Sequence, residues 1–273
     1  MSKTILITGC SSGIGKALAL EAKQQGYRVF ATARKETDLQ QLKQMGLETI
    51  ALEMTNPDSV KQAVVQLQRQ AGRLDILVNN AGFGVMGPVL DAGAEGLRQQ
   101  FEVNVFAVMD LTQACLPLLL QSKGLVVNIG SVSGIITTPF AGVYCASKAA
   151  LHSLSDALRM ELAPLGVRVL TVQPGAIATG FAQRAKLEAE QLLKADSLWW
   201  PMRDGVMLRA NASQNQPTSA ERFAKRLVRE LNKADCSGAV GIGHGAFTLP
   251  LLARLLPRKL LDKILSRKFK LVS

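Results

Sequence analysis

The sequence predicts an α/β fold: a single doubly wound parallel sheet of about seven strands with helices on both faces. Three observations predict it. Short apolar runs alternate with longer helical patterns over the first 180 residues, which is typical of βαβ units. A glycine-rich turn follows the first apolar run directly, as in dinucleotide-binding folds. No repeat or low-complexity linker divides the 273 residues, so we expect one domain over 1–273.

Seven apolar runs are expected to form the strands of this sheet. They are rich in residues with high strand propensity and are bounded by turn or helix signals. The runs cover 4–7, 27–31, 49–52, 75–78, 125–129, 167–172 and 239–242.

Helices are expected between these runs, where apolar residues recur at helical spacing. The candidates cover 14–25, 57–71, 97–121, 143–163 and 218–233. The segment 176–216 breaks the alternation, because helical spacing is present only over 186–194. Loops after the carboxyl ends of strands form binding sites in such folds, so we expect a substrate loop over about 176–216. Its Trp199-Trp200-Pro201 stretch is either a substrate wall or simple packing of that loop.

The composition, 48% hydrophobic with 23 glycines and 10 prolines, is that of a globular chain. The four cysteines form no CxxC pair, which predicts no metal site and favours free thiols in a reducing compartment, the cytoplasm. No signal peptide is expected at the N-terminus. The longest uncharged run, 124–147, is interrupted by polar residues, so no membrane span is expected there.

The net charge of +11 is concentrated near the C-terminus. Between 254 and 270 there are seven basic residues and one acidic residue, a net charge of +6. Leucines recur at helical spacing over about 246–270, and Pro250 and Pro257 are predicted to divide this amphipathic segment into two short helices. Two interpretations remain: peripheral contact with an anionic membrane surface, or a cover over the substrate pocket or a subunit contact. No nucleic-acid partner is expected, because no zinc finger or aromatic RNA-reading motif accompanies the charge.

The first motif is Thr8-Gly9-Cys10-Ser11-Ser12-Gly13-Ile14-Gly15. Glycines allow a tight turn and a close approach of the backbone to a pyrophosphate, and the following helix N-terminus supplies N–H groups. The spacing is G-x-x-x-G-x-G rather than G-x-G-x-x-G, and a tight turn without a ligand is the alternative. We favour a dinucleotide, with Gly9, Ser11, Ser12, Gly13, Ile14 and Gly15 as its binding residues.

The end of the second predicted strand indicates which dinucleotide is bound. An NAD-binding chain carries an acidic residue about 20 residues after the glycines, for the ribose 2′-hydroxyl. Here Ala33 stands 18 residues after Gly15, followed by Arg34 and Lys35. A small neutral residue avoids repulsion of a 2′-phosphate, and Arg34 can hold that group. The alternative is a solvated basic loop, and we favour NADP(H).

The third motif is Tyr144-x-x-x-Lys148, preceded at a distance of 13 residues by Ser131. Tyrosine and lysine at this spacing share one helix face. A free phenol titrates near pH 10 and is a poor base at neutral pH, but a nearby ammonium and a nicotinamide cation both favour the phenolate. Ser131 directly follows a predicted strand, at the sheet edge where ligands bind.

Together these motifs identify a resemblance to the short-chain dehydrogenase/reductase family, covering about residues 3–180. T-G-x-x-x-G-I-G stands at 8–15, Asn79-Asn80-Ala81-Gly82 matches the family's N-N-A-G, and Pro174-Gly175-x-x-x-Thr179 matches its P-G-x-x-x-T. Asn104, Ser131, Tyr144 and Lys148 match the catalytic tetrad. The resemblance implies a Rossmann-type fold. More loosely, the chain is similar to NADP-dependent retinol, hydroxysteroid and long-chain-aldehyde reductases.

The resemblance also implies residue roles. Tyr144 is the general acid in reduction and the base in oxidation, Ser131 binds the substrate oxygen, and Lys148 lowers the Tyr144 pKa and holds the nicotinamide ribose. Asn104 anchors a water in a proton relay. The remaining cofactor contacts come from Met54, Asn80, Ala81, Gly82, Pro174, Gly175, Ile177 and Thr179. A homodimer or homotetramer is expected through the helices around 97–121 and 143–163.

The expected function is therefore reduction of a lipophilic aldehyde or ketone by NADPH, or oxidation of the matching alcohol by NADP⁺. A catalytically silent nucleotide sensor or scaffold on the same fold is the alternative. Ser131, His152 and Asp156 suggest a hydrolase triad, but no G-x-S-x-G turn surrounds the serine, so His152 is expected to be a packed or surface residue. His244 lies in a glycine-rich loop as a loop residue or a substrate contact.

Overall fold

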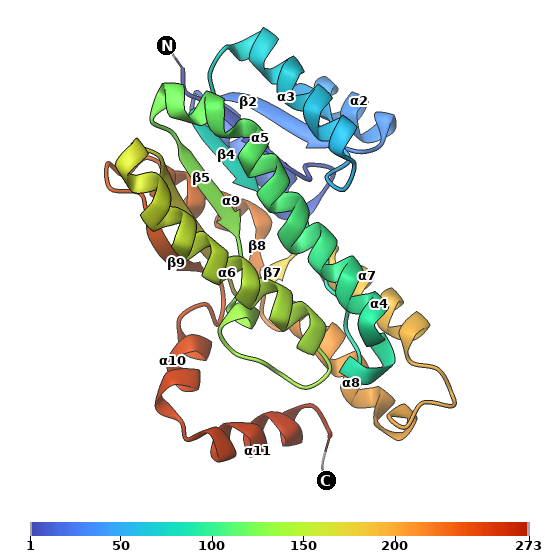
Figure 1. Cartoon of the computed structure of the whole chain (residues 1–273). Coiled ribbons are helices and arrows are strands. Elements are labelled where there is room, and N and C mark those ends of the chain that lie inside the picture. The colour runs from blue at the N-terminus through green and yellow to red at the C-terminus, as the bar shows by residue number, and fades with distance from the viewer. Residues whose placement is uncertain (1, 272–273) are drawn as a thin grey trace.

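The computed structural model describes residues 2–271 and has a seven-stranded parallel sheet at its centre, in the order β3-β2-β1-β4-β5-β6-β9 (Figure 1). This confirms the predicted fold class. The strands are Thr4–Ile7 (β1), Arg28–Ala33 (β2), Glu48–Ala51 (β3), Ile76–Asn79 (β4), Leu125–Ile129 (β5), Arg168–Pro174 (β6) and Gly238–Ile242 (β9).

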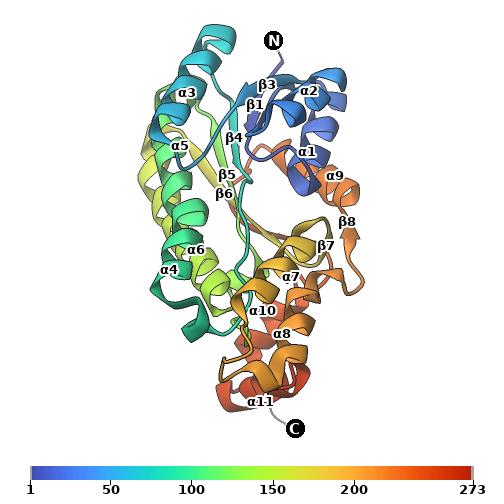
Figure 2. The ribbon, with the colours of Figure 1, turned by 90° about the vertical axis from the view of Figure 1, so that its right-hand side faces the viewer.

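Helices cover both faces of the sheet (Figure 2). Gly13–Gln24 (α1), Glu36–Gln44 (α2) and Ala220–Leu231 (α9) pack in one hydrophobic cluster with one face of the strands. Pro57–Ala71 (α3), Ala107–Ser122 (α5) and Gly142–Leu162 (α6) pack in a second cluster on the opposite face. Burial on both faces explains why the strands read as continuous apolar runs rather than alternating ones.

The sheet has a topological switch point between β1 and β4. From β1 the chain proceeds outward to β2 and β3 on one side, and from β4 outward to β5, β6 and β9 on the other. The crevice at the carboxyl ends of strands at such a point is where open α/β sheets bind ligands.

A third hydrophobic cluster lies beyond the carboxyl edge of the sheet. It joins Phe181–Leu192 (α7), Arg203–Ala210 (α8) and Arg258–Lys268 (α11) to the start of α6, and Thr248–Leu255 (α10) packs against it. Figures 1 and 2 show these four helices together at one end of the molecule. We call α7, α8, α10 and α11 the cap.

The cap is where the sequence prediction differs most from the structure. Regular structure within 176–216 is more extensive than predicted, because α7 begins at Phe181 rather than at 186 and α8 was not expected. A two-stranded sheet of Ile177–Ala178 (β7) and Thr218–Ser219 (β8) closes the base of this segment. Helices this short bury small residues such as Ala185 and Gly205, which give a weak periodic signal.

Two further differences concern helix bounds. The helix α2 was not predicted, since only Leu39 and Leu42 of its nine residues are buried. The predicted helix 97–121 begins earlier, with Val89–Phe101 (α4), which is kinked at Gly93. The two predicted C-terminal helices are present as α10 and α11. Pro257 precedes α11, whereas Pro250 lies in the first turn of α10, where helix N–H groups have no intrahelical partner to lose.

A π-helical turn, Glu102–Phe106, joins α4 to α5. Turns of this kind are rare and are frequently found at functional sites. The helical stretch Val89–Ser122 that contains it is, by length and composition, the one candidate membrane span among the described residues; half of its most apolar window is buried inside the fold, as in core helices. A search for uncharged runs misses it, because several charged residues, Glu102 and Asp110 among them, interrupt the stretch.

Candidate active site

A cavity of about 910 Å³ extends along the carboxyl edge of the sheet and under the cap. Most of the predicted site residues line it: Gly9, Ser11, Ser12, Gly13, Ile14, Arg34, Met54, Asn80, Ala81, Gly82, Ser131, Tyr144, Lys148, Pro174, Gly175, Ile177 and Thr179. Three predicted residues, Gly15, Lys35 and Asn104, are not among the lining residues. The structure therefore brings the three sequence motifs into one space.

The glycine-rich turn lies where β1 ends and α1 begins. Gly9 has φ +70°, and a Cβ there would lie 3.0 Å from the Cα of Ala81. Gly15 has a structural role, since a Cβ at this position would collide with the Gly9 carbonyl. The turn is held from β4, because the Thr8 hydroxyl accepts the N–H groups of Asn80 and Ala81, both at 2.9 Å. The side-chain amide of Asn80 donates back to the Thr8 carbonyl at 2.8 Å.

Residues at the end of β2 also line the cavity. Ala33 is buried and small, and the side chain of Arg34 is 61% exposed. The Arg34 Nη1 lies 3.5 Å from Glu53 Oε2, an exposed pair that contributes little to stability. Lys35 precedes α2 as its N-cap residue and has no place in the cavity wall. Arg34 is thus free to reach an additional anionic group at this edge.

Ser131, Tyr144 and Lys148 all line the cavity. Ser131 follows β5, and Tyr144 and Lys148 lie one turn apart on α6, where both are buried. The Lys148 ammonium donates to the Ile129 carbonyl at 2.8 Å, which fixes it against the end of β5.

The titration of these groups reflects their burial. Burial raises the pKa of the Tyr144 phenol, while a hydrogen bond with Ser131 and the positive charge of Arg209 act to lower it. Burial lowers the pKa of Lys148 to about 8. A phenol with a raised pKa is protonated at neutral pH and can donate a proton to a substrate oxygen. The predicted lowering of the Tyr144 pKa by Lys148 stays a prediction.

Asn104 lies in the π-helical turn and is fully buried. Its Oδ1 accepts the Phe83 N–H at 3.2 Å, and its Nδ2 donates to the Phe83 carbonyl at 3.0 Å and to the Ser147 hydroxyl at 3.1 Å. These contacts hold the segment after β4 against α6. The water-anchoring role that the resemblance implies stays a prediction.

His152 contacts the site from one turn beyond Lys148. Its Nε2 accepts the Ser131 N–H at 3.2 Å. Burial, together with the charge of Lys148, lowers the His152 pKa to about 4, so the ring is neutral at pH 7 and able to accept. The histidine therefore positions the Ser131 backbone, a role that its sequence position does not reveal.

Sequence reasoning also missed Arg209, a buried residue of α8 that lines the cavity near Tyr144. No sequence signal marks it, because it lies in the segment without a recognisable pattern. The tryptophans, by contrast, do not line the cavity, and Trp199 packs against the third hydrophobic cluster, which favours the packing interpretation. His244 lines the cavity, and its N–H donates to Thr218 Oγ1 at 3.1 Å.

Comparison with known proteins gives a family match. The family model described as short chain dehydrogenase matches residues 3–190. The match covers the sheet up to β6 and most of α7, and therefore all the motifs described above.

Similarity to individual proteins reaches beyond the residues that the family model matches. "Short-chain dehydrogenase ptmH" from Penicillium ochrochloron is 39% identical over 96% of this chain and 96% of that protein. The "NADPH-dependent 1-acyldihydroxyacetone phosphate reductase" of Saccharomyces cerevisiae is 32% identical over 98% of this chain and 92% of that protein. "Short-chain dehydrogenase cctT" from Talaromyces islandicus is 44% identical, but the match spans only 66% of this chain and 64% of that protein.

A solved structure agrees with the whole architecture. A short-chain dehydrogenase from Streptomyces avermitilis superposes with a TM-score of 0.80 at 28% identity, over 98% of this chain and 95% of that one. The structural likeness therefore includes the cap as well as the sheet.

Proposed function

Because this chain belongs to the short-chain dehydrogenase/reductase family, we propose that it is an NADP(H)-dependent oxidoreductase that reduces a lipophilic aldehyde or ketone, or oxidises the matching alcohol. The observation that carries the proposal is the convergence of Ser131, Tyr144 and Lys148 in the same cavity as the glycine-rich turn. The proposed general acid, Tyr144, and its partners Ser131 and Lys148 thus line the same cavity as the proposed dinucleotide-binding turn.

The residues present fit a dinucleotide. The glycine-rich turn leaves backbone exposed where any side chain at Gly9 or Gly13 would press on a neighbour and require a strained positive φ. The N–H groups at the start of α1 face this end of the cavity and suit a pyrophosphate. Gly175, Ile177 and Thr179 line the same cavity, and Thr179 lies next to Gly13. When bound, a nicotinamide dinucleotide supplies or accepts the hydride.

The chain's own residues handle the proton. In reduction, Tyr144 donates its phenolic proton to the substrate oxygen, and the Ser131 hydroxyl binds the same oxygen as negative charge develops on it. In oxidation the phenolate accepts the proton. Lys148, held on the Ile129 carbonyl, places a positive charge near the phenol. His152 keeps Ser131 in place through its backbone N–H.

NADP(H) rather than NAD(H) is proposed from the end of β2. Ala33 brings no negative charge to this edge, and the exposed Arg34 offers a guanidinium to a 2′-phosphate. The printed name of the Saccharomyces cerevisiae relative, NADPH-dependent, supports the same choice.

A lipophilic substrate is proposed from the walls under the cap. Apolar side chains from the loops after β4 and β5, from α7 and from the C-terminal segment line this part of the cavity: Met86, Ile136, Phe181, Leu249, Leu265 and Phe269. Removing apolar substrate surface from water on these walls favours binding by about 25 cal/mol per Å².

The test is NADPH oxidation by the purified protein with a panel of aliphatic aldehydes, retinal and ketosteroids, repeated with NADH. Turnover of at least one carbonyl, faster with NADPH, supports the proposal. Tight NADPH binding without turnover of any carbonyl or alcohol would instead support a silent nucleotide sensor or scaffold, the alternative that the sequence leaves open.

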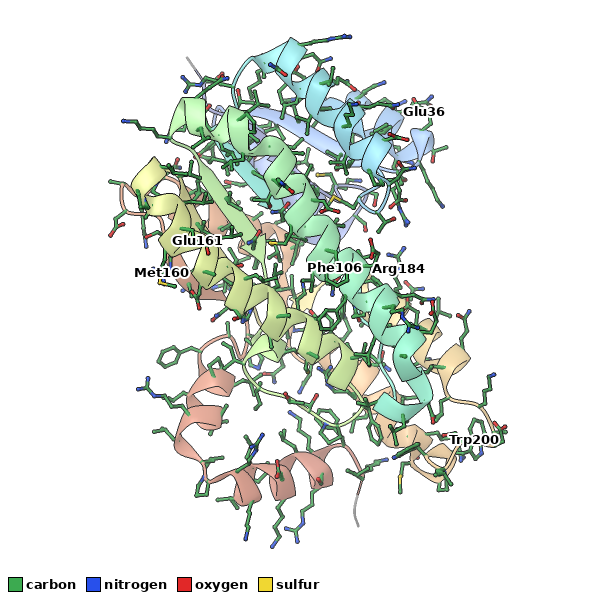
Figure 3. The ribbon with its side chains drawn as sticks, viewed as in Figure 1. Glu36, Phe106, Met160, Glu161, Arg184 and Trp200 are labelled. Atoms are coloured by element: carbon green, nitrogen blue, oxygen red, sulfur yellow. The ribbon has the colours of Figure 1, made fainter. Side chains whose placement is uncertain are left out.

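We propose the cytoplasm as the location and a homodimer or homotetramer as the assembly. Exposed apolar side chains lie on α6 and at the π-helical turn before α5; they include Phe106, which is 52% exposed, and Met160, which is 62% exposed (Figure 3). A second copy covering this face would remove them from water. Sedimentation velocity of wild type and Met160→Glu tests it, and a wild type that is monomeric at micromolar concentration contradicts it.

We also propose that the C-terminal helices contact an anionic membrane surface. Phe247, Leu252 and Leu255 are 78%, 45% and 68% exposed, and the basic residues of α11 flank them. Each basic residue near such a surface contributes about 1 kcal/mol. The test is co-sedimentation with anionic and with neutral liposomes at low and high salt, for wild type and Leu252→Glu/Leu255→Glu. Equal recovery with both liposomes indicates that the helices serve only as a cover or an interface.

A further inference from the structure

Arg209 is a buried cation whose protein partners are neutral. It projects from α8 into the cavity wall and is 8% exposed. Its Nε donates to Thr138 Oγ1 at 2.5 Å, and its Nη2 donates to Ser133 Oγ at 3.3 Å. Among residues 2–271, no carboxylate lies within 4.0 Å of its guanidinium.

A charge in such a place is costly without a partner. Transferring an ionised group from water into a protein interior is unfavourable unless it is paired, and buried arginines are normally paired. Hydroxyl oxygens use two of the five N–H donors of Arg209. The remaining donors keep the fork geometry that matches carboxylate and phosphate oxygens.

A second cation contacts the same aromatic ring as Arg209. Lys268 of α11 also lines the cavity, and its Nζ is 5.7 Å from the centroid of the Phe269 ring. The Arg209 guanidinium carbon is 5.9 Å from the same centroid. Each cation is attracted to the face of the ring, and both bring positive charge to this part of the cavity wall, which favours an anion there.

The cavity wall also contains a partly buried acidic residue. Glu188 of α7 lines the cavity, and burial raises its pKa, while the charge of Arg184, one turn earlier, acts to lower it. In the described part of the chain Glu188 makes no ion pair within 4.0 Å with Arg209 or with Arg184, and its Oε2 is buried without a hydrogen-bond partner. Within the described residues Arg209 therefore has no carboxylate partner, and its charge is met only by two hydroxyl oxygens and the face of the Phe269 ring.

The position of Arg209 assigns the anion to the substrate. Both of its partners, Ser133 and Thr138, lie in the segment between β5 and α6 that follows Ser131. Arg34 and the glycine-rich turn, which would take the phosphates of the dinucleotide, lie at β2 and β1. Arg209 and Tyr144 line the same cavity, and Ser133, which accepts from Arg209, is two residues from Ser131, so an anion bound by Arg209 would lie on the same molecule as the reacting carbonyl.

We infer that the substrate carries an oxyanion, a carboxylate or a phosphate, in addition to its carbonyl, and that Arg209 binds that oxyanion at the inner end of the cap. This inference rests on the proposed function and narrows its substrate class from lipophilic carbonyls to amphiphilic anionic ones. Lys268 supplies a second, more exposed positive charge to the same group.

The experiment compares matched substrates. ω-Oxo carboxylates of increasing chain length are assayed with NADPH beside their methyl esters, and long-chain keto phosphate monoesters beside their neutral triesters. The enzymes are wild type, Arg209→Met, Arg209→Lys and Arg203→Met; Arg203 is an exposed arginine of the same helix outside the cavity wall. The measured quantity is the ratio of kcat/KM for the anionic member to that for its neutral partner.

We expect this ratio to be at least 10 in wild type and to fall about 10–100-fold in Arg209→Met, the effect of losing a hydrogen-bonded charge pair. Arg209→Lys should retain part of the preference, and Arg203→Met all of it. The pair with the larger wild-type ratio identifies carboxylate or phosphate. Circular dichroism verifies the folding of each variant, and the wild-type ratio alone remains a test if Arg209→Met does not fold.

Three outcomes count against these proposals. Two of them overturn the inference about Arg209, and the third overturns the proposed function on which it rests. A wild-type ratio near 1 overturns it outright. An equal loss for both partners in Arg209→Met shows that the arginine acts on Tyr144 rather than on a substrate anion. No turnover of any member by wild type, with either nicotinamide cofactor, contradicts the proposed function instead.

Discussion

The two walls of the cavity are built differently. The sheet wall consists of strand ends, the glycine-rich turn and the 21-residue helix α6, and Ser131, Tyr144 and Lys148 lie at a strand end or on that long helix. The cap wall consists of helices of 8–12 residues held by contacts between remote segments. The comparison teaches that local sequence specifies the chemistry, whereas long-range packing specifies what the chemistry acts on.

The largest expected effect is on the sheet wall. Tyr144→Phe keeps the ring packed but removes the ionisable proton, so turnover should fall about 10²–10⁴-fold for every substrate while NADPH still binds. The chain has one other tyrosine, Tyr27, whose hydroxyl donates to Asn232 at 2.5 Å. Tyr27→Phe serves as the matched control in stopped-flow assays of NADPH oxidation. Retained turnover in Tyr144→Phe would falsify the assignment of the general acid.

A pH-dependent loss of stability is expected where the sheet wall holds Ser131. His152 has a pKa of about 4 in the folded protein and about 6.5 when unfolded. The unfolded state therefore binds more protons between these values, and the free energy of unfolding should fall as pH drops from 6.5 to 4, by about 3 kcal/mol at most. Urea titrations at several pH values measure it.

The control is His152→Gln, which can accept the Ser131 N–H but does not titrate in this range. Its stability should be less sensitive to pH between 4 and 6.5. A pH dependence identical to that of wild type would show that other groups cause the acid destabilisation.

The next prediction concerns the cap wall alone. A Cβ at Gly205 of α8 would collide with the Phe269 carbonyl, so Gly205→Val should push the end of α11 away and destabilise the fold by about 1–3 kcal/mol. We expect kcat/KM to fall about tenfold while the Kd for NADPH changes much less. The control is Asp204→Ala, which removes only an exposed pair with Lys270 at 3.9 Å. Equal losses of substrate and NADPH affinity would mean that the two walls are not separable.

The last expected effect is on cofactor choice and leaves the chemistry of the substrate site unchanged. Arg34→Asp replaces an exposed guanidinium by a carboxylate beside the proposed 2′-phosphate, so the ratio of NADPH to NADH efficiency should fall about tenfold or more. The reversal of charge at Lys61, an exposed residue of α3, controls for net charge. A wild-type preference for NADH would contradict the NADP(H) interpretation before any variant is made.

Sequence reasoning succeeded where a pattern is local. The apolar runs of β1 and β5, the glycine-rich turn and the Tyr144–Lys148 spacing each lie within a few consecutive residues, and the structure places them as predicted. Their periodicity is strong because the strands are buried on both faces and α6 packs along its whole length.

It failed where a residue's surroundings come from distant segments. Arg209 meets Thr138, 71 residues earlier, and packs on the Phe269 ring from the C-terminal segment. His152 meets the backbone of Ser131, a partner that no spacing rule indicates. Such contacts depend on how α8, α11 and the loop before α6 pack together. That packing produces no periodic pattern in the sequence from which it could be predicted.

The π-helical turn at Glu102–Phe106 also affects how relatives of this chain are compared. In an α-helix, each added or removed residue rotates everything that follows by about 100°, so helices that pack on a core tolerate no change in length. A π-helical turn holds one residue more than an α-helical one, and α4 and α5 already accommodate it. Length variation in this helix should therefore be confined to 102–106. There, the loss of one residue would leave both flanking helices in register and would displace Asn104 from both Phe83 and Ser147.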